Sequence, residues 1–331
     1  MEEILLRGKD GRHAACINEP KKSQSRGLDM EINTSELSFI EEVEGEKVEY
    51  SMVETWDGLY TPVAVRKPSG VGPFPIVLMA AGNGGEGLPW LMDAIRNRAY
   101  TMDRLIDAGF ACAWLRYRTE VELGYNNGGK MVRDMRQGRE MFNRSPLEYE
   151  DEIAIIDYFK TKSWVDPNKI GVIGMSHGGE MALKIVSEYH GLAAAVASEP
   201  ASHEYLALMP DDTAFVNEKT GLRNIEEMQM AEVEKVRKRI DMVIAKERIE
   251  GITTPVLVMG RDEDHLQGIF KTSFDLLNEA GKNVEWVSYD HDYHGYVFPI
   301  KGDNGKYILN DVQIGAIDHL VSWLDKKFSD A

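Results

Sequence analysis

One stretch of the sequence, residues 169–180, constrains the fold more than any other. The apolar run at 170–173 leads into Gly174-Met175-Ser176-His177-Gly178, and a helix-forming run follows at 180–186. A strand, a sharp turn carrying a serine and then a helix form a nucleophile elbow. Such a turn is tight and strained, so a side chain on either glycine would collide with the neighbouring strand or helix. The stretch therefore predicts that the serine stands above the edge of a sheet, with the amide dipoles of the new helix pointing at the site.

Strand-like and helix-like segments alternate along most of the chain. Two alternating runs around Asp57-Gly58 predict an antiparallel hairpin. Further strands are predicted at 76–80, 110–117, 170–173, 192–197, 255–260 and 284–289. Helices are predicted at 91–108, 149–161, 267–280 and 311–328. Strands interleaved with helices in this way indicate an α/β fold with a mostly parallel central sheet and helices on both faces.

The same pattern suggests how the chain is divided. Residues 1–46 are polar and weakly patterned, and we expect an N-terminal arm with a short helix at 35–42. Residues 47–331 are expected to form one domain, which residues 201–250 interrupt. Apolar residues spaced three and four apart between 233 and 243 predict a long amphipathic helix there, placed as a lid or cap over Ser176. The alternatives are a surface helix lying on the core, or a heptad-like seam that serves a homodimer.

Charge and composition exclude several kinds of partner. The net charge of −17 argues against nucleic acid and against anionic membrane surfaces, both of which need basic patches. No apolar run approaches the length needed to span a membrane. The first residues lack the basic and apolar regions of a signal peptide, so we expect a cytoplasmic protein. The two cysteines, Cys16 and Cys112, are too few for a disulfide framework.

Candidate acids and bases follow the two predicted strands that come after the serine. The strand that ends at residue 260 is followed by three carboxylates, Asp262, Glu263 and Asp264. The strand that ends at residue 289 is followed by His291 and His294. Open α/β sheets place their sites at these carboxyl ends. The order along the chain is thus a serine, an acid and a histidine, which is the order of the α/β-hydrolases.

These motifs resemble those of the dienelactone-hydrolase and prolyl-oligopeptidase-like group of α/β-hydrolases. The resemblance runs from about residue 48 to the C-terminus. Its matching pieces are Gly-Met-Ser-His-Gly-Gly, Met-Gly-Arg-Asp-Glu-Asp-His-Leu and Tyr-Asp-His-Asp-Tyr-His-Gly-Tyr. It implies the α/β-hydrolase fold and a serine hydrolase of the carboxylesterase class, EC 3.1.1. Such an enzyme cleaves a small-molecule ester through an acyl-enzyme and needs no cofactor.

Ser176 is the expected nucleophile and His294 the expected base. A serine hydroxyl is unreactive at neutral pH unless a base takes its proton. Glycine follows His294 directly, as it follows the catalytic histidine of the resembled group. His291 is an alternative base. His177 is another, although neighbours in a tight elbow point apart, so we expect its side chain to line the pocket.

The acid that orients the histidine is expected to be Asp264. Its Asp-His-Leu sequence aligns with the Asp-His-apolar step of dienelactone hydrolases. Strict counting from Gly260 favours Glu263 instead. Asp262 is a further alternative, and Glu199, just after the preceding strand, is the last.

A glycine-rich loop follows the predicted strand at 76–80. Backbone N–H groups in such a loop can bind a ligand oxyanion. We expect the oxyanion hole to be formed by the N–H groups of His177, Gly82 and Asn83. The resembled group usually has His-Gly-Gly here, whereas this chain has Ala81-Gly82-Asn83-Gly84. A phosphate loop is not indicated, because neither Gly-x-Gly-x-x-Gly nor a following Gly-Lys-Ser/Thr is present.

Three other functions compete with esterase activity. A metal site has suitable ligand types in His291, Asp292, His294, Asp262 and Asp264. However, there is no helical His-x-x-x-His pair, and a metal would leave the elbow unexplained, so none is predicted. A prolyl-oligopeptidase-like peptidase or aminopeptidase is the second option, although the chain has no room for a large N-terminal propeller. The third is a non-catalytic binding protein with the same fold, which usually lacks a member of the triad.

Overall fold

The computed structural model describes residues 31–33, 37–82, 87–117, 145–209 and 230–331. Its strands are β1 (Glu31–Asn33), β2 (Ser38–Val43), β3 (Glu46–Glu54), β4 (Tyr60–Arg66), β5 (Phe74–Ala80), β6 (Ala111–Leu115), β7 (Val165–Met175), β8 (Ala194–Ser198), β9 (Val256–Arg261) and β10 (Val284–Tyr289). Its helices are α1 (Leu88–Asn97), α2 (Tyr100–Asp107), α6 (Ser145–Lys160), α7 (His177–Glu188), α8 (Val233–Arg237), α9 (Met242–Glu250), α10 (Gln267–Glu279) and α11 (Asp311–Asp330). None of the helices in these ranges combines the length and the apolar character that crossing a bilayer requires.

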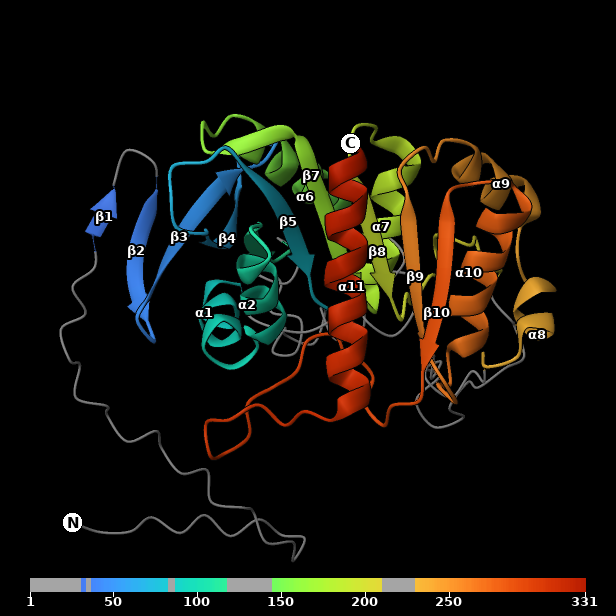
Figure 1. Ribbon diagram of the computed structural model, residues 1–331. Helices are drawn as coiled ribbons and strands as arrows, with labels where there is room; N and C mark the ends of the chain where they lie inside the picture. Colours follow the sequence, from blue (N-terminus) through green and yellow to red (C-terminus); the bar gives the residue numbers. More distant parts are fainter. Residues whose placement is uncertain (1–30, 34–36, 83–86, 118–144, 210–229) are drawn as a thin grey trace, which may run out of the picture.

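A single sheet runs through the described part of the molecule (Figure 1). Its ten strands lie in the order β1-β2-β3-β4-β6-β5-β7-β8-β9-β10. The strands from β6 to β10 are parallel to their neighbours, whereas β1 to β4 are antiparallel and β4 joins β6 antiparallel. The predicted hairpin around Asp57-Gly58 and the mostly parallel sheet are therefore confirmed.

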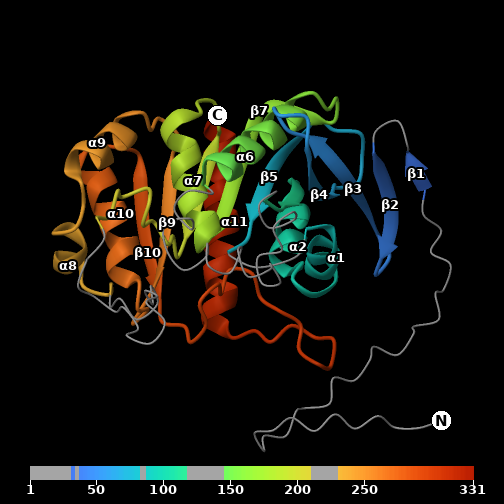
Figure 2. The same cartoon turned by 180° about the vertical axis from the view of Figure 1, so that it is seen from behind.

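Helices cover both faces of the sheet, as Figure 1 and Figure 2 show from opposite sides. One apolar core lies between the sheet and α6, α7 and α10, with Ile155, Leu183 and Ile269 among its buried residues. The other core lies beneath α1, α2 and α11. Burial on both faces explains why the central strands read as continuous apolar runs in the sequence.

The helix predicted at 35–42 is wrong. Residues 38–43 form β2, which pairs antiparallel with β3. Phe39 stacks on Tyr50 of β3, with ring centroids 4.8 Å apart, and Glu41 is buried beside Arg96. Pairing with a neighbouring strand thus overrides the weak local preference for helix. Residues 1–30 lie outside the described residues, so the division into an arm and a domain remains a prediction.

The helix predicted at 91–108 is divided into α1 and α2. Arg98 leaves the helical conformation, with φ at −135°. The Ala99 N–H donates to the Tyr307 hydroxyl at 3.0 Å instead of to a carbonyl one turn back. A distant side chain therefore supplies the hydrogen bond at the break.

The long helix predicted around 233–243 is also wrong, because α8 and α9 are separate short helices. Asp241 begins α9 by accepting hydrogen bonds from the N–H groups of Val243 and Ile244. Ile240, just before it, is buried and forms an isolated bridge with Leu208. The helices α8 and α9 pack against α10 and α7, respectively. Residues 210–229 lie outside the described residues, so the lid remains a prediction.

Candidate active site

Ser176 occupies the turn between β7 and α7. Its φ of 56° and ψ of −116° place it in a left-handed region that residues other than glycine rarely adopt. Two backbone hydrogen bonds hold it there. The Ser176 N–H donates to the Ser198 carbonyl at 2.9 Å, and the Ala201 N–H donates to the Ser176 carbonyl at 3.0 Å. The end of β8 and the residues just after it therefore fix the serine backbone from both sides.

The two glycines of the elbow are required by close backbone contacts. A Cβ on Gly174 would lie 1.9 Å from the carbonyl oxygen of Gly178. A Cβ on Gly178 would lie 2.3 Å from the carbonyl oxygen of Ala80. This confirms the steric reason for glycine that the sequence suggested.

The predicted oxyanion loop begins beside the serine. A Cβ on Gly82 would lie 3.1 Å from the Cβ of Ser176, so the Gly82 backbone is in direct contact with the elbow. Arg116, fully buried just beyond β6, donates from Nη1 to the Gly82 carbonyl at 3.4 Å, and its guanidinium lies over the Trp90 ring. Asn83 lies outside the described residues.

His177 is the first residue of α7, where amide groups have no partner within the helix. Its side chain is buried and is held from the side of α6. Nε2 lies 2.5 Å from Oε2 of the buried Glu148, and the imidazole meets the Tyr117 ring edge-on at 5.5 Å. The His177 side chain therefore contacts Glu148 and Tyr117, and not the loops that carry Asp264 and His294.

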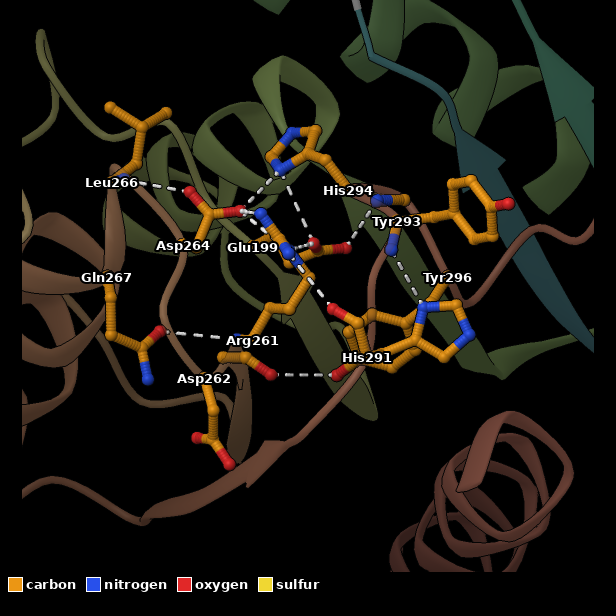
Figure 3. Close-up of polar contacts among 12 residues, drawn as sticks. Glu199, Arg261, Asp262, Asp264, Leu266, Gln267, His291, Tyr293, His294 and Tyr296 are labelled. Carbon is orange, nitrogen blue, oxygen red and sulfur yellow. Dashed lines mark hydrogen bonds and ion pairs between the residues drawn. The ribbon is translucent and has the colours of Figure 1, made fainter. Parts of the chain in front are cut away.

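The structure brings Asp264 and His294 together (Figure 3). Nδ1 of His294 lies 3.1 Å from Oδ2 of Asp264, which is fully buried. The loop that carries His294 also packs on the elbow, because a Cβ on Gly295 would lie 3.0 Å from the methyl carbon of Met175. Met175 directly precedes Ser176, so the loop that carries His294 lies against the elbow.

Two of the three alternative acids, and the alternative histidine His291, face elsewhere. Asp262 and Glu263 are exposed, and Asp262 accepts a hydrogen bond from the Ser288 hydroxyl at 2.5 Å. His291 is buried, and its Nδ1 accepts the Tyr293 N–H at 3.0 Å. Figure 3 shows Asp262 and His291 turned away from the Asp264–His294 contact.

Sequence reasoning missed Arg261, which belongs to this cluster, and ranked Glu199 last among the candidate acids. Arg261 lies against Oδ2 of Asp264, at 2.8 Å from Nε and 2.7 Å from Nη2. Glu199 is fully buried, with Oε1 at 3.3 Å from Nδ1 of His294. Arg261 ends β9 and Glu199 follows β8, so both stand at the carboxyl edge where such sheets place their sites. Their position at the ends of two predicted strands was the sequence signal that could have identified both residues.

The cluster favours an ion pair between the acid and the histidine. Burial alone would raise the pKa of Asp264, but hydrogen bonds from His294, the Leu266 N–H and Arg261 lower that pKa to about 2. Burial also disfavours charge on His294, yet Asp264 and Glu199 together raise its pKa to about 9. The carboxylate and the imidazolium therefore coexist at neutral pH.

Three side chains in this cluster could in principle hold a metal ion. Ligand atoms of Glu199, Asp264 and His294 all lie within 4.8 Å of one another. Arg261 already contacts the same carboxylates, at 2.7 Å from Asp264 and 3.6 Å from Glu199. The guanidinium thus supplies the positive charge that the two acids need, and the donor set is that of a hydrogen-bonded cluster.

Solved structures of known proteins share this fold. A carboxylesterase cloned from a metagenomic library is 18% identical, with a TM-score of 0.54 over 85% of this chain and 89% of that one. An esterase from Pyrobaculum calidifontis is 16% identical, with a TM-score of 0.54 over 84% of each chain. An acylaminoacyl peptidase from Pyrococcus horikoshii is 16% identical, with a TM-score of 0.53 over 84% of this chain. This chain matches 41% of the peptidase's length.

The sheet order, the elbow and these likenesses define the α/β-hydrolase fold. Residues 99–329 match the prolyl oligopeptidase family, which is more than half of the chain. The chain therefore belongs to the prolyl oligopeptidase family, as the motifs of the elbow and of the acid and histidine loops predicted.

The elbow contacts predict the effect of adding one methyl group. Gly174→Ala should destabilise the protein by roughly 1–3 kcal/mol or more, as overpacking usually does, because its Cβ meets a backbone carbonyl that cannot rotate away. Gly315→Ala on α11 is the matched control, since a Cβ there meets nothing within 4 Å. Removing a helix-interior glycine should raise stability by about 0.5–1 kcal/mol. Urea unfolding of both variants checks the prediction, and equal midpoints would contradict it.

The ion pair predicts a specific pH dependence of stability. His294 has its pKa raised from 6.5 to about 9, so its stabilising contribution is complete below pH 6.5 and is lost as the pH rises through about 9. The difference in unfolding free energy between wild type and His294→Gln should be on the order of 2 kcal/mol at pH 6 and should shrink towards pH 10. His190→Gln, at an exposed position, serves as control. A difference that stays constant with pH would rule out the pair.

Proposed function

We propose that this serine hydrolase is a carboxylesterase in which Ser176 is the nucleophile, His294 the base and Asp264 the acid. The supporting observation is the packing of the Gly295 loop on Met175, together with the contact between His294 and the buried Asp264. A small-molecule ester is the proposed substrate.

The chemistry follows from which histidine nitrogen is free. Asp264 holds the Nδ1 proton of His294, which leaves Nε2 to accept the proton of the Ser176 hydroxyl. The serine oxygen then attacks the ester carbonyl, and the imidazolium returns the proton to the departing alcohol. An acyl-enzyme remains. Water, deprotonated by His294, hydrolyses it and releases the carboxylic acid and the free serine.

Backbone amides are proposed to stabilise the oxyanion. The N–H of His177 at the start of α7 and those at Gly82 and Asn83 would bind the negative oxygen. One such donor is typically worth about 3 kcal/mol of barrier. Gly82 suits this position because any side chain on it would press on Ser176.

The substrate of the proposed acyl transfer is either an ester or a peptide. The likeness to the two esterases extends over most of both chains, which supports an ester. The match to the prolyl oligopeptidase family favours the second candidate, a peptidase or aminopeptidase. Both candidates use the same triad, so the choice between them lies in the leaving group.

Ser176→Ala should abolish hydrolysis of p-nitrophenyl acetate, because the acyl-enzyme cannot form without the hydroxyl. The loss should be about 10⁴-fold or more, as for other triads that act as a unit. A fluorophosphonate probe should label the wild type at Ser176 and leave the variant unlabelled. Circular dichroism shows whether the variant is folded. Turnover retained by a folded variant would exclude Ser176 as nucleophile, and a wild type that neither labels nor turns over would indicate a binding protein.

A substrate panel separates the ester from the peptide assignment. Short acyl esters of p-nitrophenol should give kcat/KM values at least about tenfold above those of aminoacyl-p-nitroanilides, a difference in barrier of about 1.4 kcal/mol. Ser176→Ala provides the background for each substrate. Faster cleavage of the anilides would make the protein a peptidase.

A further inference from the structure

Glu199 is a buried carboxylate that the proposed triad does not use. It directly follows β8 and is fully inaccessible to solvent. Its Oε2 accepts a hydrogen bond at 2.7 Å from the N–H of Gly295, the residue next to His294. Its Oε1 lies 3.3 Å from Nδ1 of His294 and 3.6 Å from Nε of Arg261 (Figure 3). Both oxygens of Glu199 are therefore directed at the histidine and its loop.

One of these oxygens lacks an aligned hydrogen bond. Among the described residues, Oε1 of Glu199 is buried and has no hydrogen-bond partner. A buried carboxylate oxygen left in this way is costly unless a positive charge faces it. The atom at 3.3 Å is the same Nδ1 that lies 3.1 Å from Asp264. A small rotation of the imidazole would thus transfer the Nδ1 proton contact from one carboxylate to the other.

The backbone at Glu199 is also unusual. Its φ of 47° lies in the left-handed region, and its N–H donates to the Met259 carbonyl at 2.7 Å. Such strain in a residue other than glycine persists only when the surroundings over-determine it. Ser198, just before Glu199, and Ala201, two residues after it, make the two hydrogen bonds that hold Ser176. One short segment therefore supports both the nucleophile and the histidine loop.

We propose that Glu199 is a second positioning carboxylate for His294, sharing the Nδ1 proton with Asp264 and tying the histidine loop to the Ser176 elbow. This inference rests on the proposed function, in which His294 is the base. Glu199 acts through His294 and does not touch the substrate. It complements Asp264 and does not replace it.

The charges around the imidazole can be counted. Among the described residues, Glu199 approaches from just after β8, Arg261 from the end of β9, and Asp264 and His265 from the loop after β9. His265 faces the other oxygen of Asp264, with Nδ1 at 3.3 Å from Oδ1. The uncharged Phe270 ring of α10 completes the surroundings. His291, on the same loop as His294, faces Tyr293 and Tyr296. The two negative charges of Glu199 and Asp264 are thus matched by only one positive charge near them, that of Arg261, unless His294 is protonated.

The kinetic test follows from that count. In the wild type, kcat/KM for p-nitrophenyl acetate should rise with pH through a midpoint of about 9, the pKa of His294. Glu199→Gln keeps an oxygen for the Gly295 N–H but removes the charge. Its midpoint should fall by about one pH unit or more, the usual effect of one adjacent charge. Asp262→Asn, which neutralises an exposed carboxylate of the neighbouring loop, is the matched control and should leave the midpoint unchanged. Superimposable profiles for wild type and Glu199→Gln would overturn the inference.

A second measurement does not depend on turnover or on the folding of Glu199→Gln. The ring-proton signal of His294 is titrated by NMR in a Ser176→Ala background and is identified by its loss in His294→Gln. In Asp264→Asn the midpoint should stay above the ordinary value of 6.5, because Glu199 still faces Nδ1. A midpoint at or below 6.5 would mean that Glu199 does not outweigh the burial of His294 and would overturn the inference.

The two proposals fail in distinguishable ways. If Ser176→Ala hydrolyses the ester as fast as wild type, the proposed function fails, whatever the His294 titration gives. If Ser176→Ala is inactive but Glu199→Gln leaves the His294 midpoint unchanged, this inference alone fails. Asp264→Asn should also hydrolyse the ester about tenfold faster than the Glu199→Gln, Asp264→Asn double variant, because only Glu199 then faces Nδ1 of His294.

Discussion

The hydrogen bonds between Ser176 and two residues at and just beyond the end of β8 are the constraint on which the site depends. A serine at φ 56° is strained by about 1–3 kcal/mol, so neighbouring structure must hold it. Ser198 and Ala201 bind its N–H and its carbonyl. Gly174 and Gly178 allow β7, α7 and β5 to approach closely enough for these bonds to form. The position of the hydroxyl is thus determined by the sheet itself and not by a loose loop.

The electrostatics of the site depend on balancing two buried carboxylates. Glu199 and Asp264 carry two negative charges in a small volume, and Arg261 neutralises one. Protonated His294 neutralises the other. The cluster is therefore balanced when His294 is an imidazolium, which is the state that forms as a serine is deprotonated. The same balance raises the pKa of His294 to about 9, so charge stabilisation is gained at the expense of neutral base near pH 7.

The sequence predicted the parts of the site that depend on local pattern. The strand, turn and helix around Ser176 are encoded by adjacent residues, and His294 is marked by the glycine after it. The local pattern could not by itself identify the acid that faces the histidine. Asp262, Glu263 and Asp264 are adjacent, and a turn in which Glu263 has φ 58° decides which of the three side chains points at His294. Glu199 is nearly a hundred residues away from His294 in the chain, and the parallel pairing of β8, β9 and β10 brings them together. Tertiary pairing likewise turned 38–43 into a strand.

The region 201–250 is anchored at two of the three loops that carry the proposed triad, the nucleophile loop and the acid loop. At its start the Ala201 N–H donates to the Ser176 carbonyl, and near its middle the Met230 N–H donates to the His265 carbonyl at 3.1 Å. Its helices α8 and α9 rest on α10 and α7, which begin just after those loops. A segment fixed to the nucleophile loop and the acid loop is well placed to contact whatever is bound between them. This anchoring is the physical reason to retain the lid as a proposal, although its predicted single helix is wrong.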